Sequence, residues 1–341
     1  MAFPKPGRHN RRDLEEHQLS PQAKGARDEA FDIAKGVGIV AVVGLHLSSR
    51  SASLFYKPFD GAWWVLKWIN LFLNFCVPLF LLISAVLLAR SLSRSLATLP
   101  GGTALRPSRS GRVEESGSAN GSVWARYALR RIRSVLLPLL IWSAIFWLLR
   151  AYVRHDAAVM RPGFWGDLKG RLMDLAFGKA EFHLYFLSVL AQFCLVLAFL
   201  VLLFRRGRTN IWHALLIATL LQGAAFALQK VVRFEWPGAT VFWYLSILIP
   251  GVWVGMNWPE WPEVRRRTWA AWILLAILGF AVFGYDSALD LEKQATNGTL
   301  TNAASSAYAL GISFLILALL TLWNGGKLLP PYRRPFWGAA F

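Results

Sequence analysis

The sequence predicts an all-α membrane protein, a polytopic bundle of at least eight transmembrane helices. Of its 341 residues, 55% are hydrophobic and only 16% are charged, and the mean hydropathy is +0.41. Soluble domains average about 45–50% apolar and about 25% charged residues. A water-soluble globule of this composition would have to expose much of its apolar area, so we exclude the soluble class as the default.

The long apolar runs are the second observation. A helix needs about 20 mostly apolar residues to cross the hydrocarbon core of a bilayer. Between the runs, the Ser-, Gly- and Arg-rich stretch 91–123 predicts a flexible cytoplasmic loop, and we expect a single membrane-embedded domain over 31–341. The eight runs lie at roughly 31–49, 64–89, 134–152, 184–204, 211–229, 239–257, 268–284 and 304–323.

The distribution of charge predicts the orientation. Lys and Arg number 37 against 19 Asp and Glu, a formal net charge of +18, but they form short clusters between the apolar runs. A nucleic-acid binder needs such residues on one folded polar face, so that class is not favoured. Residues 1–30 are a polar, basic tail without the apolar core of a signal peptide. With this tail in the cytoplasm, most basic clusters fall inside and 150–183 is the exception, so we expect an N-inside topology. We expect a multi-pass protein of the cell inner (cytoplasmic) membrane.

The cysteines and histidines predict no metal site. Cys76 and Cys194 lie within apolar runs without CxxC spacing, and we expect them to be packing residues rather than disulfide or zinc partners. His155, Asp156 and His183 do not have the spacing of a metal site. The sequence also contains no phosphate-binding glycine loop and no Gly-x-Ser-x-Gly nucleophile elbow.

Polar side chains inside a membrane span are costly and are candidates for function. The first run, FDIAKGVGIVAVVGLHL, contains Asp32, Lys35 and His46. His46 lies eleven positions after Lys35, so on a helix the two side chains share a face and lie about 16 Å apart along the axis. The alternative interpretation is structural: Lys35 snorkels beside Asp32, and His46 is hydrogen-bonded within the bundle.

A basic pair precedes the third run. Arg130 and Arg133 are three residues apart and are therefore neighbours on a helix, able to bind one polyanion together. The alternative is that they meet anionic lipid at the inner surface. Four tryptophans near the predicted outer boundaries could stack on sugar rings, although such residues more often form the interfacial belt; they are Trp63, Trp64, Trp165 and Trp236.

Four segments, in order, resemble the acyltransferase-3 family of integral-membrane acyltransferases. Lys35 and His46 are similar to its first-helix pattern, in which Arg or Lys precedes His by this spacing, and the second run resembles its Val-Pro-x-Phe-Phe-x-x-Ser-Gly segment, which places Ser84. The arginine pair fits an Arg-x-x-Arg element before a proline, and FHLYFLSVL resembles His-Leu-Trp-Phe-Leu, which places His183 and Tyr185.

The sequence departs from the family pattern in two places. Ser84 is followed by Ala85 and Val86, where the family usually has Gly and an aromatic residue. The family typically has ten spans, and this chain stops at PFWGAAF, about where its last helix would begin. We therefore expect a shortened C-terminus.

The resemblance implies an O-acyltransferase that moves an acyl group, acetyl above all, from acyl-CoA to a hydroxyl of an extracytoplasmic glycan or lipid-linked sugar. It implies direct transfer, with acyl-CoA (acetyl-CoA) as co-substrate and no bound cofactor. His46 would be the general base. Lys35 would complete the catalytic pair by holding the donor or orienting the helix, with Asp32 as its partner. Arg130, Arg133 and Ser84 would bind the acyl donor, and His183 and Tyr185 would support the site.

Two other classes stay open. In a polytopic transporter or flippase, Asp32, Lys35 and His46 would line a substrate or proton path, although the sequence has no matching pair of broken helices. In a non-catalytic scaffold for envelope assembly, replacement of His46 would leave the cellular phenotype intact.

Overall fold

The computed structural model describes residues 29–97, 117–153, 167–205, 210–292 and 296–322, and within these ranges the chain is helical and has no strand. Helices are expected here because backbone polar groups in a bilayer must find partners within their own segment. The all-α prediction is therefore confirmed. The α-helices are α2 (Glu29–Leu54), α3 (Gly61–Phe72), α4 (Cys76–Ala97), α5 (Gly117–Tyr152), α7 (Leu168–Ala176), α8 (Tyr185–Arg205), α9 (Ile211–Val232), α10 (Leu245–Met256), α11 (Trp261–Leu291) and α12 (Gly298–Leu322).

Seven segments of the described chain are long and apolar enough to cross a membrane. Five of them are single helices: α2, α5, α8, α9 and α12. The other two continue through a short 3-10 turn, because η2 (Leu73–Phe75) joins α3 to α4 and η6 (Trp258–Glu260) leads into α11. The chain is thus a multi-pass membrane protein, with spans close to seven of the eight apolar runs.

One of the eight expected runs, 239–257, differs from the other seven in the length of its helix. It forms η5 (Val241–Tyr244) and α10, and the apolar stretch Val241–Met256 is too short to count with the other spans. A helix of this length covers about 24 Å, less than the core thickness of about 30 Å. Of the eleven positions from Leu245 to Gly255, all but Ser246 are buried, so this helix lies inside the bundle. The expectation of at least eight full-length spans is therefore not confirmed.

The structure describes only parts of the polar segments. The stretch expected as a flexible loop, 91–123, starts within α4, which continues to Ala97, and finishes within α5, which begins at Gly117. Residues 98–116, like 1–28 of the expected tail, lie outside the described residues. The exception in the charge pattern, 150–183, contains the short helix α7 and the 3-10 turn η3 (Phe182–Leu184).

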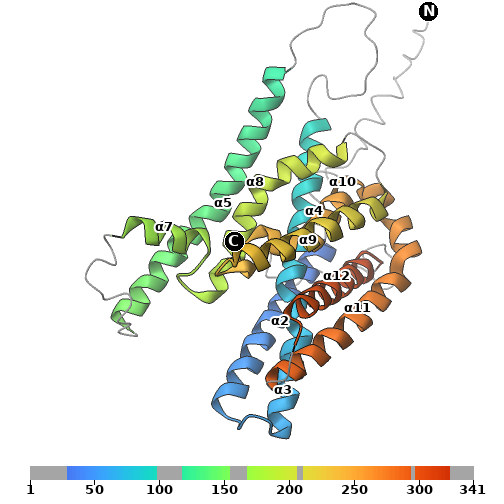
Figure 1. Ribbon diagram of the computed structural model, residues 1–341. Helices are drawn as coiled ribbons and strands as arrows, with labels where there is room; N and C mark the ends of the chain where they lie inside the picture. Colours follow the sequence, from blue (N-terminus) through green and yellow to red (C-terminus); the bar gives the residue numbers. More distant parts are fainter. Residues whose placement is uncertain (1–28, 98–116, 154–166, 206–209, 293–295, 323–341) are drawn as a thin grey trace, which may run out of the picture.

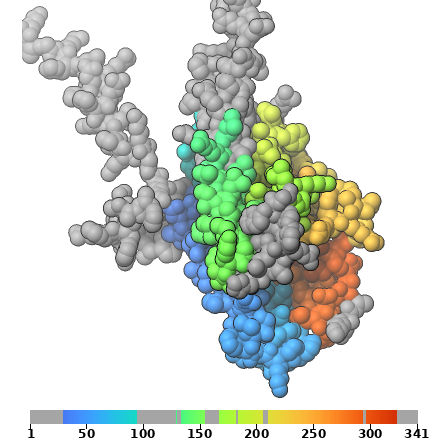
Figure 2. Space-filling model, turned by 90° about the vertical axis from the view of Figure 1, so that its left-hand side faces the viewer, coloured from blue at the N-terminus to red at the C-terminus, as the bar shows by residue number. Residues whose placement is uncertain are grey.

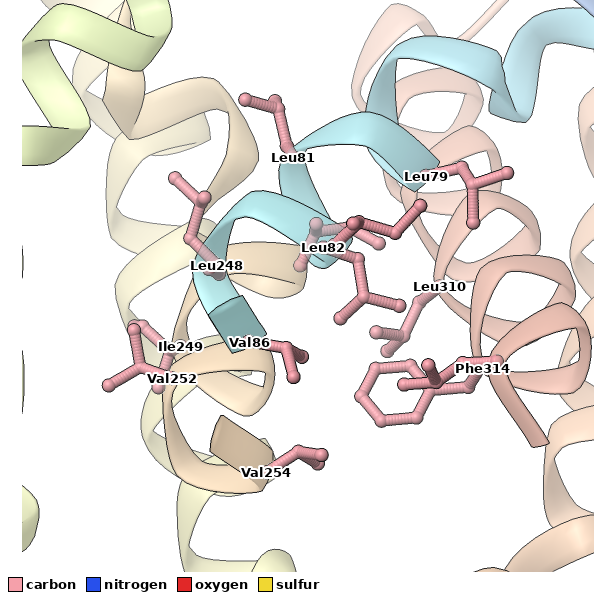
Figure 3. Close-up of a cluster of buried hydrophobic side chains, with 14 of the residues drawn as sticks. Leu79, Leu81, Leu82, Val86, Leu248, Ile249, Val252, Val254, Leu310 and Phe314 are labelled. Atoms are coloured by element: carbon pink, nitrogen blue, oxygen red, sulfur yellow. The ribbon is translucent and has the colours of Figure 1, made fainter. Parts of the chain in front are cut away.

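The core forms where α10 packs on α4 and α12 (Figure 3). Small residues allow the close approach: a Cβ atom on Gly251 would lie 2.8 Å from that of Ala85, and one on Gly255 would lie 2.9 Å from that of Ala89. Without a hydrophobic driving force between helices in lipid, this close van der Waals packing stabilises the bundle. This packing also explains why Ala85 and Val86 follow Ser84, because both are buried against the glycines of α10.

The other helices surround this core. α2 packs on α3, α4 and α12, and α11 packs along α12 (Figure 1). By contrast, α5 contacts α8, α7 and η3, and its span is the least buried of the seven. Figure 2 looks onto the side of the molecule that carries α5, with the α2–α3 hairpin below it.

Candidate functional site

The first span carries its polar residues at two levels, as the spacing predicts. Near its start, the Nζ atom of Lys35 lies 3.2 Å from Oδ1 of Asp32, and both side chains are partly exposed. His46 follows on the same helix, about 16 Å further along the axis, where it is half-buried. The chain therefore separates an ion pair near one end of α2 from an imidazole near the other end.

The imidazole of His46 lies close enough to that of His183 for the two rings to interact electrostatically. His183 belongs to η3, directly before α8, and its ring makes an edge contact with Phe146 of α5, with centroids 4.8 Å apart. Three segments that are far apart in the sequence therefore bring two histidines together. This pair is the centre of the candidate site.

Gly178 determines the backbone turn between α7 and η3. It follows α7 with a positive φ of 64°, and a Cβ atom there would lie 2.5 Å from the backbone nitrogen of Tyr185. Only glycine fits such a left-handed position in contact with another backbone. The turn therefore sets α7 directly against the first residue of α8, two positions after His183.

Asn70 of α3 contributes a contact that the sequence did not single out. Its Nδ2 donates to the carbonyl oxygen of Leu45 at 2.8 Å and to Oγ of Ser48 at 3.4 Å. Ser48, which is buried, donates to the same carbonyl at 3.0 Å. Leu45 precedes His46, so this small network holds the turn of α2 that carries the imidazole. The available signal was an asparagine inside an apolar run, which is costly unless it has partners.

Tyr185 belongs to a second polar group beside the histidines. Its hydroxyl interacts with that of Tyr244, and the Tyr244 hydroxyl donates to the carbonyl oxygen of Gly238 at 3.0 Å. On the neighbouring position of α8, the ring of Phe186 packs against Phe80 of α4, with centroids 5.8 Å apart. These contacts tie the start of α8 to α4 and to the segment before α10.

The predicted donor-binding residues lie on α4 and α5. Arg133 is exposed on α5, at the residue where the membrane-crossing part of that helix begins, and the side chain of Arg130 lies outside the described residues. Ser84 is half-buried on α4, next to the contact between α4 and α10.

A further basic residue, Arg90, lies near the start of α2. Its guanidinium lies 4.6 Å from the ring centroid of Trp258, which in turn contacts Phe31 of α2 at 5.3 Å between centroids. Phe31 directly precedes Asp32 in the sequence. The cation is therefore held by an aromatic side chain close to the Asp32–Lys35 pair.

The described residues contain no group of three His, Cys, Asp or Glu side chains that could hold a metal ion. The described site has two interacting histidines, His46 and His183, at one level of the bundle, and the cationic side chains of Lys35 and Arg90 near the start of α2.

Comparison with known protein families gives one match. The family model described as Acyltransferase domain, that of the acyltransferase-3 family, matches residues 28–332. Comparisons with curated proteins and with solved structures gave no match. The matched range includes every described helix, since it begins before α2 and ends after α12.

Proposed function

The chain belongs to the acyltransferase-3 family, and on that premise we propose that it transfers an acetyl group from acetyl-CoA to a hydroxyl of an extracytoplasmic glycan or lipid-linked sugar. Its family and its membrane-crossing helices make it a membrane acyltransferase. The acyl group, the donor, the acceptor and the residue roles are the proposal. One observation supports the roles above all, the juxtaposition of His46 and His183 from separate helices.

His46 is the general base in this proposal. Its imidazole takes the proton from the acceptor hydroxyl, the hydroxyl oxygen attacks the thioester carbonyl, and the carbon–sulfur bond breaks. Coenzyme A leaves as a thiolate and takes up the proton that His46 removed, which restores the neutral imidazole. An imidazole suits the first step because it exchanges a proton near neutral pH. We assign His183 the orientation of the acceptor hydroxyl, and Tyr185 the support of His183 through its contact with Tyr244.

The cationic side chains bind the donor in this proposal. Coenzyme A is a polyanion of the cytosol, so its phosphates need positive charge at the cytoplasmic end of the bundle. Lys35 and Arg133 are both at least partly exposed, and with Arg130 they supply that charge. The pantetheine arm then extends along α2 past Ser84, toward His46 about 16 Å away. Charge at one level and an imidazole at another match a donor whose phosphates and thioester are far apart.

The test is the release of coenzyme A. Purified protein in lipid vesicles is incubated with labelled acetyl-CoA, and the release of label to water or to an acceptor is measured. His46→Ala should lower the rate about 100-fold or more, because a positioned general base contributes about 10²–10⁴. The matched control is His213→Ala, an exposed histidine at the start of α9, which should keep the wild-type rate.

Two results would contradict the proposal. A His46→Ala variant with the wild-type rate would remove the base assignment. If vesicles carrying the wild-type protein move solute across the bilayer but never release coenzyme A, the protein is a transporter, and the acyl-transfer proposal fails.

A further inference from the structure

An apolar cavity of about 500 Å³ lies between α5, α7, α8 and the segment that leads into α10. Its walls include Leu136 and Leu140 of α5, Phe177 after α7, and Phe242 of η5. Several lining side chains are half-exposed or more, among them Leu195 at 67% and Phe242 at 57%. In a membrane these side chains face lipid, so the cavity opens sideways into the bilayer. We call it the lateral groove.

One face of α8 forms the floor of the lateral groove. Ser188, Ala191, Gln192 and Leu195 all line it, and their spacing of three, four and seven residues places them on one side of a helix. This face is about 10 Å long. It starts five residues after His183, so the groove leads along α8 from the candidate site toward the other end of the helix.

The Gln192 side chain holds the walls together. Its Nε2 donates to the carbonyl oxygens of Ala239 at 2.9 Å and Ala176 at 3.3 Å, and its Oε1 accepts from the backbone N–H of Val241 at 2.9 Å. Ser188 also donates to the Ala176 carbonyl. These polar groups are thus used to join α7, α8 and the segment before η5, and the surface left for an occupant is apolar.

A cation marks the rim of the lateral groove. The Nζ atom of Lys179 lies 5.8 Å from the ring centroid of Phe177, which lines the groove, and 5.1 Å from that of Trp236. Lys179 also pairs with Glu235 at 3.5 Å, but the Glu235 side chain is 79% exposed. The Lys179 side chain itself is only 23% exposed. Because its carboxylate partner stands in solvent, the ion pair is weak, and an anionic group of a ligand can replace the carboxylate. Trp236 is typical of the interface between lipid and water.

We propose that the lateral groove binds the apolar tail of a lipid-linked acceptor with a phosphate in its headgroup. The tail lies along the groove face of α8, the phosphate meets Lys179, and the headgroup hydroxyl reaches the His46–His183 pair. This inference rests on the proposed function and deepens it, because it names the lipid-linked sugar rather than the free glycan as acceptor. An apolar groove, a cation at its rim and a neighbouring imidazole pair together fit this one class of ligand.

The test is photolabelling in vesicles. The full-length protein is reconstituted into phosphatidylcholine with a diazirine derivative of farnesyl phosphate, and the labelled peptides are mapped by mass spectrometry. Label should concentrate on 188–195 of α8 and 136–140 of α5. Ala191→Trp fills the groove and should lower this labelling about tenfold, which corresponds to about 1.4 kcal/mol of binding free energy. The matched control is Ala224→Trp, at an exposed position on α9, which should label like the wild type.

Two further probes distinguish the tail from the phosphate. Lys179→Gln should lower labelling by farnesyl phosphate about fivefold, since one basic residue near a membrane surface contributes about 1 kcal/mol to the attraction of an anionic lipid. The same variant should leave labelling by the uncharged farnesol probe unchanged. A diazirine phosphatidic acid tests whether a diacyl lipid takes the place of an isoprenoid. If it labels the groove better than farnesyl phosphate, the groove binds diacyl lipid of the bilayer, and its assignment to a lipid-linked acceptor is overturned.

The experiments distinguish failure of the groove proposal from failure of the proposed acyl transfer. Equal labelling of all lipid-facing helices, or unchanged labelling in Ala191→Trp, would overturn the groove proposal even if the enzyme releases coenzyme A. His46→Ala should keep the wild-type labelling pattern, because His46 does not line the groove in this proposal. If the groove is labelled but neither the wild type nor any variant transfers acetyl, the lipid site stands and the proposed function fails. Thermal unfolding of each variant identifies any that does not fold.

Discussion

At the scale of single residues, the position of His46 depends on its neighbours as much as on its own helix. The Leu45 carbonyl accepts from both Asn70 and Ser48, at 2.8 Å and 3.0 Å. In an apolar bundle, a side-chain amide that spans two helices fixes both their distance and their rotation. We therefore regard Asn70 as a positioning residue for the imidazole, one that reaches it only through the backbone of α2.

Replacing Asn70 tests this role. Asn70→Leu keeps an apolar surface between α2 and α3 but removes a hydrogen bond that contributes about 1 kcal/mol. We expect kcat for acyl transfer to fall about fivefold, while KM for acetyl-CoA stays unchanged because the donor contacts remain. Asn74→Leu, at an exposed position four residues further on, is the control and should match the wild type. A rise in KM alone would assign Asn70 to donor binding instead.

Lys35 should have the opposite kinetic signature. We propose that it binds a phosphate of the donor, and a hydrogen bond to a charged group contributes about 1.5–3 kcal/mol. Lys35→Ala should therefore raise KM for acetyl-CoA about tenfold or more, with a smaller effect on kcat. The measurement is steady-state release of coenzyme A over a range of donor concentrations. Lys230→Ala, an exposed lysine in the last turn of α9, serves as control, and equal KM values in the two variants would contradict the role.

At the scale of helices, small residues decide which pairs approach closely. A Cβ atom on Gly311 of α12 would lie 2.6 Å from the backbone nitrogen of Ala276 of α11. On the facing helix, one on Gly279 would lie 2.5 Å from the nitrogen of Tyr308. Real Cβ atoms do not approach so closely, so α11 and α12 must separate if either glycine is replaced. By contrast, nothing lies within 4 Å of the corresponding position at Gly223 of α9.

The two kinds of glycine should respond oppositely to alanine. Gly311→Ala should lower the free energy of unfolding by about 1–3 kcal/mol, because overpacking forces backbone shifts. Gly223→Ala should leave it unchanged or raise it by about 0.5–1 kcal/mol, since alanine is the better helix former. Unfolding in mixed micelles with increasing denaturing detergent measures both changes. Equal effects of the two substitutions would show that the α11–α12 contact is not tight.

At the scale of the whole molecule, the basic clusters predict which end faces the cytoplasm. Basic residues lie near the start of α2, late in α4 and near the start of α11, as Lys35, Arg90 and Arg265–Arg267 show. Arg90 and the start of α2 also meet through Trp258, so these ends lie together in the fold. Under the positive-inside rule we expect these ends on the cytoplasmic side of the membrane and the α2–α3 hairpin on the outer side.

Cysteine labelling tests this orientation. The natural cysteines, Cys76 and Cys194, are buried and should react little. In intact cells, a membrane-impermeant maleimide should label Lys57→Cys in the α2–α3 hairpin, whereas Glu260→Cys in η6 should react only after permeabilisation. Labelling of both variants in detergent confirms that each thiol is accessible once the membrane is removed. The reverse pattern would place the N-terminus outside and would put the proposed donor site on the wrong side for cytosolic acyl-CoA.

The sequence by itself determined the membrane class, seven of the spans and the placement of Lys35 and His46 on one helix. These properties are local, because hydropathy and helical spacing depend on residues near one another in the chain. The tertiary structure decided the rest. His46 and His183 are 137 positions apart, and whether they meet depends on how α2, α5 and η3 pack. Likewise, the burial of α10 and the groove held by Gln192 follow from contacts between distant helices, and no local pattern encodes such contacts.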